Sequence, residues 1–290
     1  MALVACGLAL LSLAAGCASR VASGTEPTNQ VTDGFVRILG HAPTGVAADV
    51  AGRGVMRVVN DAAYPPFSSL NDAGEMVGFD VDVAKAVANV LGVRLVQEQS
   101  AWDTIPAGLD GGRFDASIGS MTATEKRRQL LSFTSPYYWS VEHLAIRSGA
   151  PTIDGSAEMR GKTIGCSAES TAFDYLREVK GVTIEPYLNE VDGLADLRKG
   201  RLDAYMSQLS VLMTSISSGQ PLELSGPPLY YTAASVAYRK GEDDWGELLQ
   251  YAVATLRDDG TLAEASRHWF WGFDLTRPPR DGAPVEGAAQ

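Results

Sequence analysis

The fold class is decided by residues 55–98, which read VMRVVNDAAYPPFSSLNDAGEMVGFDVDVAKAVANVLGVRLVQE. The runs Val55 to Asn60 and Val93 to Glu98 are short and rich in β-branched residues, as buried strands are. Between them, Asp80 to Leu91 repeats apolar residues at helical spacing, with acids in its first turn and Gly92 as its stop. A strand, a helix and a second strand in this order predict an α/β unit.

The same alternation extends over most of the chain. Strands or helices are predicted at residues 114–118, 144–147, 163–166, 171–179, 182–187, 192–199, 203–207 and 209–217, and two amphipathic helices at 245–257 and 262–271. Breaks that contain Gly and Pro at 148–151 and 226–228 indicate domain boundaries. A chain of 290 residues is long enough for two compact domains. The polar stretch at 276–290 is predicted to be a disordered tail.

Composition and charge narrow the class of function. The chain is 45% hydrophobic and 20% charged, which is typical of a globular protein, and its formal net charge of -11 argues against a nucleic-acid partner. The histidines His41, His143 and His268 are scattered and lack the spacing of a zinc site. We therefore expect neither a metal nor another cofactor.

The first residues have the composition of an export signal. Residues 1–16 carry no charge, and their apolar run is too short to span a bilayer, so they are predicted to be a signal peptide. Leu13-Ala14-Ala15-Gly16-Cys17 resembles a bacterial lipobox, which implies cleavage before Cys17 and its lipidation. An ordinary signal peptide with an incidental cysteine is the alternative. Residues 17–53, rich in Gly, Ala, Thr and Pro, are then predicted to be a lipidated flexible tether. The absence of basic residues after Met1 leaves the true translation start open.

An anion site is predicted at residues 119–128, Gly-Ser-Met-Thr-Ala-Thr-Glu-Lys-Arg-Arg. Thr122 to Glu125 fits a capping box, in which the Thr hydroxyl and the Glu side chain satisfy the free backbone donors of a starting helix. Arg127 adds a planar fork of donors that suits a carboxylate. A solvated surface helix is the alternative, because a capping box followed by arginine is common.

A second cluster, Asn60-Asp61-Ala62-Ala63-Tyr64-Pro65-Pro66-Phe67, follows the first predicted strand. Ligand crevices of α/β sheets lie at the carboxyl ends of strands. The rings of Tyr64 and Phe67, together with that of Trp102, would enclose an apolar or cationic group there. Packing of all three rings in the core is the alternative.

Together these motifs resemble the extracellular solute-binding proteins of family 3, which bind polar amino acids for ABC importers. The shared pieces, in chain order, are Tyr64-Pro65-Pro66-Phe67, Gly78-Phe79-Asp80-Val81-Asp82, Trp102-Asp103, Phe114-Asp115-Ala116, Met121 to Arg127, Phe133 to Tyr138 and Arg257 to Leu262. The resemblance runs from about residue 55 to residue 274. It implies a two-lobed α/β clamshell of the type II periplasmic-binding-protein kind, which closes on its ligand by hinge motion.

The resemblance also implies the domain plan. Lobe 1 would span 54–145, lobe 2 would span 146–235, and the chain would return to lobe 1 at 236–275. Two crossover strands would form the hinge, near His143 to Arg147 and near Ala234 to Tyr238.

Ligand contacts are implied residue by residue. Arg127 and the Thr122 backbone would hold a carboxylate, helped by the backbone at Thr171 in the lobe 2 turn that also contains Ser170. Tyr64, Phe67 and Trp102 would enclose the ligand side chain. Ser120 and Thr122 would accept hydrogen bonds from an α-ammonium group, and Asp61 would lie at the distal end of the ligand.

The sequence departs from the family at one important position. The aspartate that usually binds the ammonium group is replaced by Gln208, and an amide cannot neutralise a buried cation. Glu169, at a position usually taken by glycine, is either the substitute or a solvated turn residue. Glu190 and Asp192 are expected to be surface charges.

Three functions are compatible with these features. The first is a monomeric substrate-binding lipoprotein of an ABC importer, not an enzyme, held at a membrane in the periplasm or on the cell surface and partnered by the permease. The second is a dehydratase of the cyclohexadienyl or arogenate type on the same fold, for which Glu169 is the only candidate acid. The third is a sensory ligand-binding domain. The identity of the ligand is left open.

Overall fold

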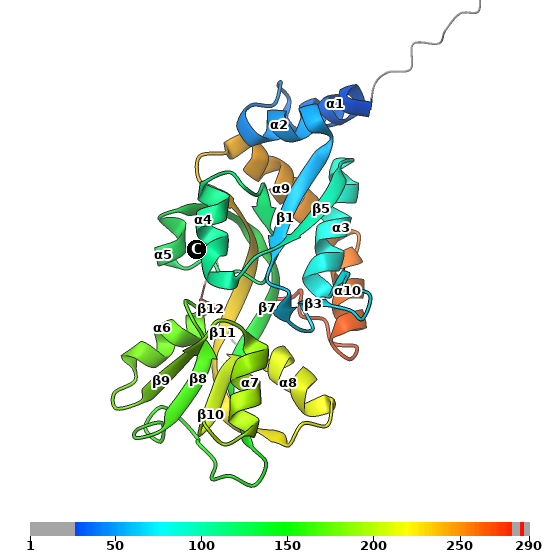
Figure 1. The fold of residues 1–290 in the computed structure, drawn as a ribbon. Helices are drawn as coiled ribbons and strands as arrows, with labels where there is room; N and C mark the ends of the chain where they lie inside the picture. The colour runs from blue at the N-terminus through cyan, green and yellow to red at the C-terminus, as the bar shows by residue number, and fades with distance from the viewer. Residues whose placement is uncertain (1–26, 280–284, 287–290) are drawn as a thin grey trace, which may run out of the picture.

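The structure, a computed structural model, describes residues 27–279 and 285–286. Two α/β lobes are stacked along the long axis of the molecule, and two long strands pass between them (Figure 1). These strands are β7 (Leu131–Arg147) and β11 (Leu222–Arg239), which pair antiparallel with each other. The predicted fold class, a two-lobed α/β fold, is confirmed.

Lobe 1 is built around parallel strands near the N-terminus. Its elements are β1 (Val55–Asn60), α3 (Phe79–Leu91), β5 (Arg94–Gln99), η1 (Trp102–Thr104), α4 (Ile105–Asp110), β6 (Ala116–Ser117), α5 (Glu125–Arg128), α9 (Asp243–Asp258) and α10 (Thr261–Trp269), with a small antiparallel sheet of β2 (Ala63–Tyr64), β3 (Ser68–Leu70) and β4 (Met76–Val77). Strand β1 pairs in parallel with both β5 and β6.

Lobe 2 repeats the same construction on a smaller scale. Its elements are β8 (Thr163–Ser167), α6 (Thr171–Glu178), β9 (Thr183–Tyr187), α7 (Glu190–Arg198), β10 (Ala204–Gln208) and α8 (Leu209–Ser217). Strand β8 pairs in parallel with both β9 and β10.

One sheet runs through both lobes in the order β5-β1-β6-β11-β7-β10-β8-β9. Because β1 and β6 are parallel, their carboxyl ends meet at one edge of lobe 1, and the carboxyl ends of β8 and β10 meet in the same way in lobe 2. The segments that follow these four strands therefore supply the residues of a site between the lobes.

The crossover strands are longer than predicted. Strand β7 pairs with β11 from Leu131 to Arg147, and within this span Glu142 to Ala145 also pair with β10 of lobe 2. The predicted segment from His143 to Arg147 is only the lobe 2 end of β7, because Pro136 and alternating polar residues obscure the first half of the strand in the sequence.

The prediction of a flexible tether is wrong for residues 27–53. Helices α1 (Pro27–Leu39) and α2 (Gly45–Arg53) cover the end of lobe 1 that lies farthest from lobe 2 (Figure 1). Phe35 and Val50 are fully buried, and the ring of Phe35 lies 6.4 Å from that of Trp245 in α9. The few apolar residues of this segment fall on one face of each helix, so they complete the core despite the small-residue composition.

The two chain ends depart from the predictions or lie outside the described residues. In the segment predicted to be a disordered tail, β12 (Val285–Glu286) pairs in parallel with Tyr231 and Thr232 of β11. The predicted signal peptide and Cys17 lie outside the described residues. Within the described ranges, none of the helices is both long and apolar enough to cross a membrane.

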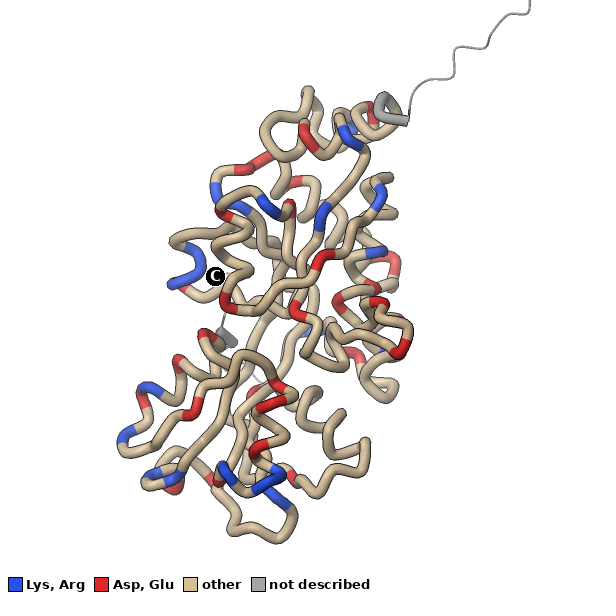
Figure 2. The backbone as a smooth tube through the Cα atoms, viewed as in Figure 1, with Lys and Arg blue, Asp and Glu red and all other residues tan. Residues whose placement is uncertain are grey.

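Charged residues of both signs are spread over the two lobes (Figure 2). In the described part of the chain, this view shows no continuous basic stripe along either lobe.

Candidate functional site

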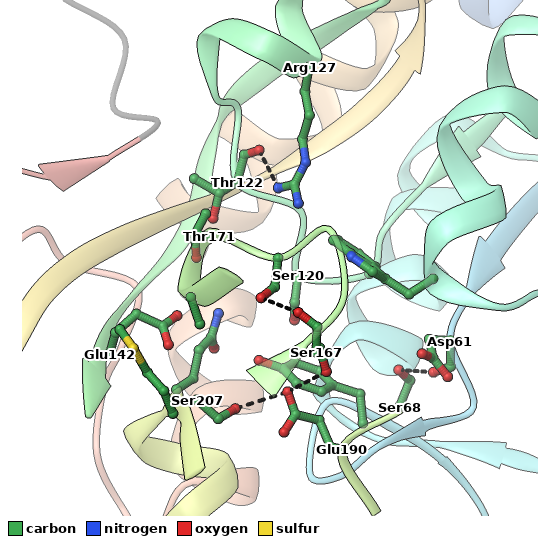
Figure 3. Close-up of a pocket in the computed structure, with 17 residues that line it drawn as sticks. Asp61, Ser68, Ser120, Thr122, Arg127, Glu142, Ser167, Thr171, Glu190 and Ser207 are labelled. Carbon is green, nitrogen blue, oxygen red and sulfur yellow. Dashed lines mark hydrogen bonds between the residues drawn. The ribbon is translucent and has the colours of Figure 1, made fainter. Parts of the chain in front are cut away.

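A cavity lies between the two lobes and is lined by both of them and by β7 (Figure 3). Its empty volume is about 610 Å³, part of which is open to solvent. The lining residues are Asp61, Tyr64, Ser68, Trp102, Gly119, Ser120, Thr122 and Arg127 from lobe 1, Glu142 from β7, and Ser167, Ser170, Thr171, Ala172, Glu190, Met206, Ser207 and Gln208 from lobe 2. All the predicted ligand-binding residues except Phe67 and Glu169 line this cavity.

Three groups among the described residues help to hold Arg127 in place. Its Nη1 donates to the Thr122 carbonyl at 2.9 Å, and its Nη2 donates to the Glu169 carbonyl of lobe 2 at 2.8 Å. The guanidinium carbon lies 5.0 Å from the ring centre of Trp102, over its face. The fork is therefore oriented at the junction of the lobes, where it faces the cavity.

The predicted capping box is not formed. Helix α5 begins at Glu125, and its N-cap is Thr124, whose Oγ1 accepts from the Arg127 backbone N–H at 3.3 Å. Thr122 precedes this cap, is 3% exposed and forms an isolated antiparallel bridge with Ala234. Since α5 is a single turn, the positive charge of this wall resides mainly in the guanidinium of Arg127.

Ser120 is fixed in an unusual conformation at the carboxyl end of the β6 segment. Its φ of 57° lies in the left-handed region, which costs a non-glycine residue about 1–3 kcal/mol. Its Oγ donates to Asp80 Oδ2 at 2.7 Å, and its backbone N–H donates to Tyr137 Oη at 2.9 Å. Tyr137 in turn donates to Asp80 Oδ1 at 2.6 Å. This network orients the Ser120 backbone at the cavity wall.

Asp80 is the centre of that network and is completely buried. Burial raises its pKa to about 7, and the hydrogen bonds from Tyr137 and Ser120 oppose this rise. The start of α3 lies close to the Tyr-Pro-Pro-Phe turn, because a Cβ on Gly78 would sit 2.1 Å from the Phe67 carbonyl oxygen. The segment that begins at Gly78 therefore helps to position the residues of the cavity wall, through Asp80 and through its contact with the Tyr-Pro-Pro-Phe turn.

The three predicted aromatic residues divide between cavity and core. Tyr64 and Trp102 line the cavity. Phe67 does not: it is fully buried, with its ring stacked 5.3 Å from that of Tyr64 and 5.0 Å from that of Tyr138. The alternative of core packing holds for Phe67, because the turn directs its ring into the lobe 1 core.

Gln208 lines the cavity and is 5% exposed. Its Oε1 accepts a hydrogen bond from Tyr138 Oη at 3.1 Å. Directly opposite, in the antiparallel register of β10 and β7, stands Glu142, which is 3% exposed. Sequence reasoning missed Glu142, although an acid within the apolar strand segment that it occupies was a usable signal.

Glu169 is not the cavity acid that one interpretation required. Its side chain is exposed and pairs with Lys126 Nζ at 2.6 Å, which together with the other nearby cations lowers its pKa. Its φ of 55° explains why glycine suits this position. The alternative of a solvated turn residue is correct, and only the Glu169 carbonyl takes part, through Arg127.

Glu190 was expected at the surface and is instead 5% exposed in the cavity wall. Its Oε1 accepts from Ser167 Oγ at 2.9 Å and from Ser207 Oγ at 3.1 Å. Burial raises its pKa to about 7, and Asp61 adds to the rise. The expectation is wrong because Ser167 of β8 and Ser207 of β10 enclose the Glu190 side chain. Asp192, two residues later, is exposed as expected.

The other predicted residues of lobe 2 lie where α6 begins. Ser170 is its N-cap, accepting from the Phe173 N–H at 3.1 Å, and Thr171 is its first residue. On the opposite side of the cavity Asp61 caps its own turn, with Oδ1 accepting from the Ala63 N–H at 2.9 Å, and burial raises its pKa.

Metal-binding and thiol chemistry have little support among the described residues. These residues contain no group of three or more His, Cys, Asp or Glu side chains arranged to hold a metal ion. Cys166 in β8 is fully buried, and burial raises its pKa to about 12, so its thiol stays protonated.

The chain is similar to known binding proteins along most of its length. The family model of bacterial extracellular solute-binding proteins, family 3, matches residues 56–272. The L-cystine-binding protein TcyJ of Escherichia coli (strain K12) is 32% identical over 239 residues, covering 81% of this chain and 90% of that protein. ABC transporter arginine-binding protein 1 of the same strain is 32% identical over 218 residues, covering 72% and 88%.

A solved structure extends the similarity to three dimensions. The ancestral amino acid-binding protein AncCDT-1, a precursor of cyclohexadienyl dehydratase, matches with a TM-score of 0.72 and 25% identity. The match covers 77% of this chain and 98% of that one. The similarity therefore includes both lobes and the strands between them.

Proposed function

The chain belongs to the bacterial extracellular solute-binding proteins of family 3, and from this premise we propose that it is the substrate-binding protein of an ABC importer. It captures a small amino acid or amino-acid-like carboxylate between its lobes and delivers it to the permease. The observation that carries the proposal is the guanidinium of Arg127, oriented by Trp102 and by carbonyls of both lobes at the wall of the cavity.

Each wall of the cavity has a role in this proposal. Arg127 binds the ligand carboxylate through its planar fork, and the backbone at Thr122 and Thr171 adds donors. The Ser120 carbonyl accepts from the ligand's amino group. Tyr64 and Trp102 stack on the ligand, and Ser170 lies beside its carboxylate. Asp61 lies at the distal end of the ligand.

Hinge motion of β7 and β11 opens and closes the cavity. In the present conformation Lys126 and Arg127 of lobe 1 contact Glu169 of lobe 2. Lobe 1 comprises 54–145 and 236–275, and lobe 2 comprises 146–235. Small-angle scattering with and without ligand tests this motion: an unchanged radius of gyration over saturating ligand contradicts it.

The ligand is identified most directly from the purified protein. Mass spectrometry of the solute released on unfolding gives its identity, and calorimetry with a panel of amino acids and small carboxylates gives affinities. Binding of a carboxylate-bearing amino acid supports the proposal. If no amino acid, opine or small carboxylate binds, the proposed function is wrong.

A lipid anchor at Cys17 is part of the proposal. It rests on the small residues before Cys17. Mass spectrometry of the mature N-terminus tests it, since acylated Cys17 and a Cys17→Ser variant released from the membrane are the expected results. An unmodified terminus at another residue contradicts it.

A dehydratase activity is not proposed. Glu169, the candidate acid, lies outside the cavity lining, and Lys126 and the other nearby cations lower its pKa, so it is a poor proton donor. The similar curated relatives cited above are binding proteins. Turnover of prephenate or arogenate by the purified protein is the result that contradicts this position.

A further inference from the structure

Acidic residues outnumber basic ones among the described residues that line the cavity. Among the described lining residues, Arg127 is the only Lys or Arg, whereas Asp61, Glu142 and Glu190 are carboxylic acids. Figure 3 shows Glu142 and Asp61 on opposite sides of the cavity, with Arg127 above and Glu190 below. If Arg127 binds the ligand carboxylate, a surplus of acidic groups faces the rest of the ligand.

Glu142 lies where the missing counter-charge is needed. It stands opposite Gln208 in the register of β7 and β10, so a carboxylate is present one strand away from the expected position. The Gln208 amide oxygen already accepts from Tyr138. A buried ammonium group requires an anion to offset its desolvation, and at this end of the cavity Glu142 supplies it.

Glu190 provides a second negative pole. Its Oε1 is bound by two serine hydroxyls, but its Oε2 is buried and has no hydrogen-bond partner among the described residues. The Tyr205 hydroxyl lies near it, and this contact lowers the pKa of Glu190. A buried carboxylate oxygen without a donor is costly, and a ligand cation removes that cost. Asp61 lies close enough to raise the pKa of Glu190, so the two acids act on the same region.

We propose that the cleft selects α-amino acids that carry a second cationic group, with Glu142 as the counter-charge of the α-ammonium and Glu190 with Asp61 as that of the distal cation. This inference rests on the proposed function and names its substrate class. The two cationic groups of the bound ligand then face the three acids, and its carboxylate faces the guanidinium of Arg127.

Proton release accompanies binding in this arrangement. The titratable groups near Glu190 are Asp61, Tyr64, Cys166 and Tyr205. Each of these side chains is either neutral or negatively charged, so none of them can act as a cationic partner. Without ligand, burial holds the pKa of Glu190 at about 7, so near neutral pH it is partly protonated. A cation beside it lowers that pKa, and the proton leaves to solvent.

Matched ligand pairs test the proposal by calorimetry. L-Arginine against L-citrulline and L-lysine against L-norleucine differ mainly in the distal cation, and L-cystine carries a distal ammonium together with a second carboxylate. We expect the tightest ligand to carry a second cationic group and to bind roughly 10- to 100-fold more tightly than its neutral partner. If a neutral or acidic amino acid binds tightest, the inference is overturned while the proposed function stands. If no amino acid binds, both fail.

Single variants test the two proposed counter-charges separately. Glu142→Gln is expected to weaken all α-amino acids, and adding Gln208→Asp to it is expected to restore binding, because the counter-charge returns across the strand pair. Glu190→Gln is expected to reduce the preference for the cationic member of each pair and to abolish proton release. Asp192→Asn, on the exposed side of α7, is the matched control and leaves both unchanged.

Each variant is accompanied by its thermal unfolding curve. A folded Glu142→Gln that binds as the wild type does overturns the first assignment. A folded Glu190→Gln with an unchanged preference and unchanged proton release overturns the second and shows Glu190 to be a neutral structural acid.

Discussion

Replacement of Arg127 by alanine is the sharpest test of the carboxylate clamp. The guanidinium offers a planar fork at the cavity wall, and two charge-assisted hydrogen bonds to a ligand carboxylate are worth about 1.5–3 kcal/mol each. Their loss amounts to about 3–6 kcal/mol, or roughly a 10²- to 10⁴-fold weaker Kd. Isothermal titration calorimetry with the tightest ligand of the panel measures this change.

Two comparisons separate the clamp from a general loss of structure. Arg127→Lys keeps the charge but not the fork, so we expect an intermediate loss. The α-amide of the same ligand lacks the carboxylate, and its weak binding is expected to be nearly equal in wild type and Arg127→Ala. The alanine variant also loses its contacts with the Thr122 and Glu169 carbonyls, which unfolding curves will register. An affinity within about threefold of wild type for the carboxylate ligand refutes the assigned role.

Three further predictions concern stability. Phe35→Ala is expected to cost about 3–5 kcal/mol in denaturant unfolding because its ring is fully buried, whereas Val36→Ala on the 37% exposed side costs little; equal effects contradict the packing of α1. Burial raises the pKa of Asp80 to about 7. The Asp80 carboxyl group therefore stabilises the fold most below about pH 4, and this contribution is lost as the pH rises through 7. Relative to Asp80→Asn, the wild type is therefore expected to lose on the order of 4 kcal/mol over this range, and parallel pH profiles contradict this. Lys126 and Glu169 are exposed, so a double-mutant cycle is expected to give at most about 1 kcal/mol, and a larger coupling is the contrary result.

The body of the fold was predictable because its hydrophobic periods are local. Helix α3 was expected at Asp80 to Leu91 and begins at Phe79, one residue earlier. Helix α8 matches its predicted bounds, Leu209–Ser217. Each of these segments carries its period, start and stop within a dozen or so residues, so no distant contact is needed to define it.

The errors have a common physical cause, which is burial by distant segments. The apolar residues of α1 are few, and only the cover that lobe 1 requires makes Phe35 a core residue. Glu190 opens an amphipathic helix, which is typical of a surface acid, but Ser167 and Ser207 from two neighbouring strands enclose it. Glu142 and Gln208 are far apart in sequence, and only the register of β7 against β10 makes them neighbours. A single sequence does not specify that register.

The distribution of acids links ligand charge to closure of the lobes. Asp61 belongs to lobe 1, Glu190 to lobe 2 and Glu142 to the strand between them, so closing an empty cleft brings like charges into a poorly solvated space. Two of the lobe contacts that favour closure, the Lys126–Glu169 pair and the Arg127 hydrogen bond, are partly exposed and therefore weak. A ligand with two cationic groups turns the repulsion into attraction, whereas a neutral side chain leaves it in place. Because a ligand shifts a conformational equilibrium only by its differential affinity for the two states, closure itself becomes selective for cationic ligands.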